Sequence, residues 1–111
     1  MEFTVEEFGD RRRWTADDLA SRAADGRVRV ADVVAEHPEA THVTFEARDG
    51  YRASIPLDVA RRQGLLFLEE DGSIRLRVEE GATLCWNVKD LADVRLTIGP
   101  EPDSVPENPI H

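Results

Sequence analysis

Residues 49–57 read Asp-Gly-Tyr-Arg-Ala-Ser-Ile-Pro-Leu, and the organisation of the chain follows from this stretch. Before it, residues 41–48 alternate polar and apolar side chains, with Val43 and Phe45 on one face, which is the period of a half-buried strand. The Asp-Gly pair is a turn signal, and the residues after it begin a second strand, which Pro56 ends because proline has no N–H for the strand ladder. We therefore predict that this part of the chain is a β-hairpin.

The same signals recur along the chain and predict further short elements. Thr15 and Asp18 form a capping box that opens a helix, and Asp25-Gly26 ends it. Two more short helices are expected, and the run Arg11-Arg12-Arg13 is expected to be solvated. The two further helices are at 31–36 and 56–63, and the strands are at 41–48, 51–55, 65–69, 73–78, 83–87 and 94–98, with a short edge strand in 1–8 and a brief strand at 28–30. The predicted fold class is α+β, a mainly hairpin-connected mixed β-sheet with about three short helices.

One face of these strands is expected to supply most of the core. Its predicted members are Val43, Phe45, Ile55, Leu66, Leu68, Ile74, Leu76, Val78, Leu84, Trp86, Leu96 and Ile98. A chain of 111 residues can bury one modest core, so we predict a single domain over residues 1–99. Residues 100–111 contain four prolines with polar spacers and are expected to form a disordered tail.

Composition limits the classes of function. The chain has 14 Lys+Arg against 23 Asp+Glu, a formal net charge of −9, so binding to nucleic acid or to an anionic membrane is not expected. Cys85 is the only cysteine, and the three histidines are scattered, which gives no disulfide framework and no metal-ligand spacing. No signal peptide and no long apolar run occur in the sequence, so we expect a cytoplasmic protein.

The amino-acid sequence of the opening stretch also resembles that of a known family. Tyr-x-Ala-Ser-Ile-Pro-Leu at 51–57 resembles the segment of sulfite oxidase and its relatives, the molybdopterin-binding oxidoreductases, that carries an active-site tyrosine. The likeness extends to 28–34 and 40–46 upstream and to 65–72 downstream, and we place residues 14–98 in the resemblance. It implies a minimal sulfite-oxidase-like molybdopterin-domain fold, with Tyr51 in the position of the active-site tyrosine.

Several functional parts of that family are missing from this sequence. The resemblance places the molybdenum-ligand cysteine between the first helix and the segment at 28–34, but the interval 24–27 contains none. A family lysine on a later strand corresponds to Cys85, and a family strand arginine falls on Leu76. We therefore expect no catalytic residue, no metal site and no cofactor in this chain, although molybdopterin binding stays open as an alternative.

Two functional hypotheses follow. The first is a non-catalytic domain that binds a partner or a small anion, and the second is a molybdopterin-dependent oxidoreductase completed by a partner chain. For the first, Tyr51, Arg52, Arg75 and Arg77 are candidates to hold sulfate, sulfite or a carboxylate, because guanidinium groups grip oxyanions with paired donors. The alternative interpretation is that the tyrosine covers the hairpin and the arginines pair with the acids at 69–70 and 79–80. Loss of the family's outer segments also predicts an uncovered strand edge, and hence a homodimer or a docked partner, with a monomer as the alternative.

Overall fold

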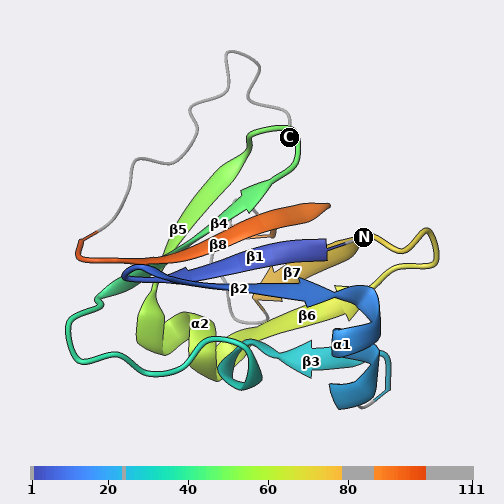
Figure 1. Ribbon diagram of the computed structural model, residues 1–111, viewed down its shortest axis with the longest axis horizontal. Helices are drawn as coiled ribbons and strands as arrows, with labels where there is room; N and C mark the ends of the chain where they lie inside the picture. Colours follow the sequence, from blue (N-terminus) through green and yellow to red (C-terminus); the bar gives the residue numbers. More distant parts are fainter. Residues whose placement is uncertain (1, 24, 79–86, 100–111) are drawn as a thin grey trace.

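The chain folds as two β-sheets and short helices that share one core (Figure 1). The computed structural model describes residues 2–23, 25–78 and 87–99. In these residues the elements are β1 (Glu2–Glu7), β2 (Asp10–Thr15), α1 (Ala16–Arg22), β3 (Arg27–Arg29), the 3-10 turn η1 (Val30–Asp32), β4 (His42–Ala47), β5 (Arg52–Pro56), α2 (Leu57–Gln63), β6 (Gly64–Leu68), β7 (Ile74–Val78) and β8 (Leu91–Thr97). The fold is thus mixed α and β and built mainly from strands, as the sequence predicts.

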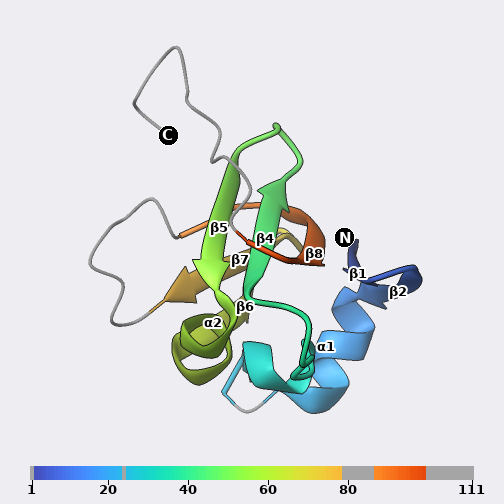
Figure 2. The ribbon, with the colours of Figure 1, turned by 90° about the vertical axis from the view of Figure 1, so that its left-hand side faces the viewer.

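The large sheet has five strands in the order β2-β1-β8-β4-β5, and the small sheet has three in the order β3-β6-β7. β1 runs parallel to β8, whereas the other pairs of neighbours are antiparallel. A bridge between Leu76 and Val88 joins β7 to the segment that leads into β8. Figure 2 shows α2 beneath β5 and α1 beneath β1 and β2, so the helices flank the small sheet.

The hairpin that the opening stretch predicts is confirmed. β4 and β5 pair antiparallel, with Val43 opposite Ile55 and Phe45 opposite Ala53, and all four side chains are buried. Gly50 turns the chain with φ +95°, a conformation that side-chain-bearing residues rarely adopt. The hairpin of β6 and β7 is confirmed as well, and its turn contains Gly72 at φ +87°.

The predicted core is largely confirmed, with Ile98 as the clear error. Most predicted members are buried between the two sheets, and Leu68 is partly buried. Ile98 is 71% exposed because β8 ends at Thr97, so the alternation of the strand no longer decides where the next side chain points. Leu84 and Trp86 lie outside the described residues, as do most of the strand predicted at 83–87 and the tail predicted at 100–111.

Two strands near the N-terminus differ from the prediction. The arginines at 11–13 are exposed, as predicted, but they belong to β2, an edge strand that was not expected from the sequence. An edge strand tolerates such charge because much of it faces water, while the buried Trp14 anchors its other end. As a consequence β1 is an inner strand, covered by β2, and not the edge strand that its sequence suggests.

The predicted helices are only partly present. α1 opens with the predicted capping box, in which the Thr15 N–H donates to Asp18 Oδ2 at 2.9 Å and so lowers the pKa of Asp18. α2 follows Pro56 as expected. The helix predicted at 31–36 is instead the single turn η1. Beyond that turn, the Val34 carbonyl accepts a hydrogen bond from Arg61 Nε at 3.0 Å. The final strand also begins earlier than predicted, at Leu91.

We expect Phe45→Ala to lower the free energy of unfolding by about 3–5 kcal/mol, because the ring is fully buried and its removal leaves a cavity. Ile98→Ala is the matched control, since its exposed side chain should matter by less than about 0.5 kcal/mol. Denaturant unfolding of both variants measures the difference. Equal midpoints for the two variants would show that Phe45 is not a core residue.

Candidate functional site

Tyr51, the residue that carries the family resemblance, is a buried part of the β4–β5 turn. Its N–H donates to Asp49 Oδ1 at 3.0 Å, and its carbonyl accepts the Ala47 N–H at 2.8 Å. The residue as a whole is 9% exposed. This geometry supports the interpretation that Tyr51 covers the hairpin, and its backbone hydrogen bonds stabilise the turn.

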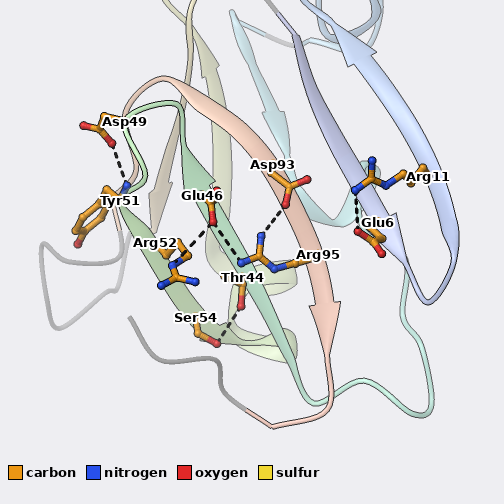
Figure 3. A network of polar contacts seen from close by, with 10 residues as sticks. All are labelled: Glu6, Arg11, Thr44, Glu46, Asp49, Tyr51, Arg52, Ser54, Asp93 and Arg95. Carbon is orange, nitrogen blue, oxygen red and sulfur yellow. Dashed lines mark hydrogen bonds and ion pairs between the residues drawn. The ribbon is translucent and has the colours of Figure 1, made fainter. Parts of the chain in front are cut away.

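Arg52 belongs to a charge network on the outer face of the large sheet (Figure 3). Glu46 is its centre: its carboxylate lies 3.9 Å from Arg52 Nε and 3.3 Å from Arg95 Nη2. Arg95 also contacts Asp93 at 2.7 Å. Two arginines therefore meet two carboxylates, and the network carries no net charge.

Arg75 and Arg77 lie on β7, in the other sheet, so the structure does not place them in one site with Tyr51 and Arg52. Arg75 Nε lies 3.0 Å from Glu69 Oε1, but the N–H is not aligned with it, and this buried nitrogen has no hydrogen-bond acceptor. Arg77 is exposed. Both side chains point away from the core, because Ile74, Leu76 and Val78 between and beside them are buried.

The register of the small sheet brings these two arginines together with two others. Arg27 of β3 stands opposite Phe67 of β6, which stands opposite Arg75, and in the next row Arg29, Leu65 and Arg77 align in the same way. Neighbouring strands are about 4.8 Å apart, and residues two apart along a strand are separated by about 6.8 Å. We call this surface the arginine face, and its members are Arg27, Arg29, Leu65, Phe67, Arg75 and Arg77.

The arginine face carries a local excess of positive charge on a chain whose formal net charge is −9. Glu69 pairs with Arg75, whereas Arg27, Arg29 and Arg77 have no carboxylate within ion-pair distance in the described part of the chain. All three are exposed, and Leu65 and Phe67 between the rows are partly exposed. Guanidinium groups around a small apolar platform suit an oxyanion, because each offers several donors in one plane.

Sequence reasoning missed Arg27 and Arg29. The available signal was the repeated pattern of an arginine on each side of a buried residue, Arg-Val-Arg at 27–29 and Arg-Leu-Arg at 75–77. This pattern puts each pair of arginines on the outer face of its own strand. The sequence did not reveal that both strands pair with β6, which is what makes one surface of the two patterns.

Cavities also lie on the surface of the described residues, and the two considered for a ligand are the following. One, of about 650 Å³, is between the loop at 36–41 and the start of α2, and its lining mixes Glu36 and Asp58 with His37 and Arg61. The other, of about 690 Å³, borders the arginine face at Arg75 and is otherwise mostly acidic. Neither lining has the excess of cations that an anion requires.

The described residues also supply no ligand set for a metal, since they contain no group of three His, Cys, Asp or Glu side chains in a suitable arrangement. Cys85 lies outside the described residues. The segment between α1 and β3, where the resemblance places the molybdenum thiolate, has no cysteine in its sequence. The side chains of this segment therefore do not include the thiolate that would hold molybdenum.

No helix in the described ranges has the length and apolar character needed to cross a bilayer.

We expect Glu46→Gln to lower the free energy of unfolding by about 1 kcal/mol, because it leaves Arg52 and Arg95 without their shared carboxylate on a partly covered face. The loss should shrink in about 1 M salt, which screens the freed charges. Glu36→Gln is the control, since that side chain is 85% exposed and its ion pair with Arg61 spans 3.5 Å. Thermal melts that show the same loss for both variants would contradict the central role of Glu46.

Comparisons with protein-family models, with curated proteins and with solved structures give no match to this chain. The arginine face is therefore the feature from which a function can be inferred.

Proposed function

We propose that this chain is a non-catalytic binding domain whose arginine face holds a small oxyanion such as sulfate, sulfite or a carboxylate. The observation that carries the proposal is the alignment of four arginines in two rows around Leu65 and Phe67. Of the four residues that the sequence singles out, the proposed site keeps Arg75 and Arg77 and leaves Tyr51 and Arg52 outside it.

The spacing of the rows suits an anion held between two strands. Arg29 and Arg77 stand on either side of Leu65, so their Cα atoms are about 9.6 Å apart. Two extended guanidinium groups can converge over the intervening leucine and donate to the same anion.

The openness of the arginine face supports binding over catalysis. Arg27, Arg29 and Arg77 are exposed, and the surface is the outer side of a three-stranded sheet. A reacting group there would stay in contact with water, whereas enzymes that transfer electrons or acyl groups usually exclude it. The site therefore suits reversible capture of an anion.

We also propose kinship with the molybdopterin-binding domain of sulfite-oxidase-type enzymes. The support is the segment at 51–57, which forms the end of the hairpin turn, β5 and the start of α2. Within that kinship, the chain is a form without the molybdenum-ligand cysteine, and molybdopterin is not part of its proposed function.

The anion site is tested by titrating sulfate, and separately sulfite, at constant ionic strength while amide shifts are recorded. We expect the shifts to concentrate at Arg29, Leu65 and Arg77, and to disappear in the double variant Arg29→Ala/Arg77→Ala. The control Arg11→Ala/Arg13→Ala removes the same charge from β2, where both arginines already have carboxylate partners, and should leave the shifts unchanged. Shifts spread evenly over the molecule would refute the site.

A separate experiment tests whether the chain binds molybdenum and oxidises sulfite. The chain is expressed in a host that makes molybdopterin, and its molybdenum content is measured by mass spectrometry together with sulfite-dependent electron transfer. We expect no bound molybdenum and no activity, because molybdenum in the resembled family needs a protein thiolate held at a fixed distance. Near-stoichiometric metal would favour the oxidoreductase hypothesis, and Cys85→Ser would then test the remaining thiol.

A further inference from the structure

β3 is an edge strand whose free side can be assigned residue by residue. The Gly26 carbonyl accepts the Leu68 N–H at 3.3 Å, so these two residues form a hydrogen-bonded position of the β3–β6 ladder. Antiparallel ladders alternate hydrogen-bonded and non-hydrogen-bonded positions. Val28 is therefore bonded toward β6, and the backbone N–H and C=O groups of Arg27 and Arg29 point to the other side.

That other side of β3 is open in the described structure. β3 is the terminal strand of the small sheet, and no described strand pairs with its outer side. In Figure 1 it forms the lower border of the sheet, with α1 at one end. Two N–H donors and two carbonyl acceptors are thus presented in the arrangement that recruits an additional strand.

Arg27 and Arg29 also place their side chains on the arginine face. Side chains directly opposite each other on neighbouring strands have Cβ atoms about 5 Å apart, so a strand added to β3 would set two alternate residues against these arginines. Carboxylates at those two positions would pair with them. The residue between would lie on the same side as the buried Val28, which favours a small apolar side chain there.

We propose that the edge of β3 binds an extended segment of a partner protein in which two acidic residues flank one small apolar residue. This inference rests on the proposed function, since it uses the same arginine face, and it names the carboxylates of a protein segment as the oxyanions. The backbone of β3 supplies the strand pairing, and Arg27 and Arg29 select the acidic sequence.

The charges of the chain distinguish β3 from the other arginine-bearing edge. On β2, Arg11 and Arg13 already contact Glu6 at 3.3 Å and Glu2 at 3.5 Å. Arg27 and Arg29 have no such partner among the described residues. A second copy of the chain paired through β3 would set arginine against arginine, which opposes that dimer. The lack of carboxylate partners for Arg27 and Arg29 and the repulsion between two copies both favour an acidic partner.

The test uses the full chain and two capped peptides of identical composition, Thr-Thr-Glu-Val-Glu-Thr-Thr and Thr-Thr-Val-Glu-Glu-Thr-Thr. In an extended strand the first sets both glutamates on one face, whereas the second splits them between faces. We expect the alternating peptide to bind more tightly and to slow hydrogen exchange at the amides of Arg27 and Arg29. Arg27→Ala/Arg29→Ala should weaken binding between about 2-fold and 30-fold, the range that two exposed ion pairs span, and Arg11→Ala/Arg13→Ala should not weaken it.

The outcomes separate this inference from the proposed function. Equal affinity for the two peptides, or unchanged exchange at Arg27 and Arg29, overturns strand addition, and the sulfate titration then shows whether the anion site survives alone. A loss of binding in the Arg11→Ala/Arg13→Ala control as large as in the β3 variant also overturns it, because generic charge would then explain the affinity. Light scattering that shows a dimer which the peptide does not disperse assigns the edge to a second copy instead.

Discussion

Most strands of this protein bury one face in the core that the two sheets share, and the remaining features depend on that constraint. Val28, Leu66 and Leu76 turn inward from the three strands of the small sheet. Because side chains alternate along a strand, the arginines beside Val28 and Leu76 are directed to the outer surface. The arginine face is therefore a consequence of the core, and a change that shifted the register of β3 or β7 by one residue would remove it.

The charged side chains on the outer faces of the two sheets are paired to different extents. On the large sheet, acids and arginines occupy neighbouring strands, and Glu46 lies next to both Arg52 and Arg95, so the charges compensate each other. On the small sheet the middle strand β6 contributes Leu65 and Phe67, which separate the arginine-bearing strands without supplying a carboxylate. Arginines that look similar in the sequence thus form ion pairs within the large sheet, whereas on the small sheet they form the surface that is proposed to bind an anion.

The sequence predicted the local parts of this structure and not the long-range ones. The β4–β5 and β6–β7 hairpins follow from alternation and from glycine-containing turns, which act over a few residues. Nothing in a single sequence shows that β3 pairs with β6 or that β1 pairs with β8, because those partners are distant in the chain. The candidate site shared this limit: Arg75 and Arg77 could be singled out, whereas Arg27 and Arg29 became relevant only through the pairing of β3. The error at Ile98 has a similar origin, since the end of a strand depends on its neighbours.

The position of β8 affects how the molecule can be made. This strand, the last of the described residues, lies in the middle of the large sheet, between β1 and β4, so residues from opposite ends of the described chain are neighbours. During synthesis the β1–β2 and β4–β5 hairpins leave the ribosome first, but the strand that joins them is translated after both. Such non-local pairing slows folding relative to helical proteins of similar size. The nascent chain therefore exposes the inner edges of two half-sheets until β8 emerges, an interval in which a chaperone or a neighbouring nascent chain can compete for the same edges.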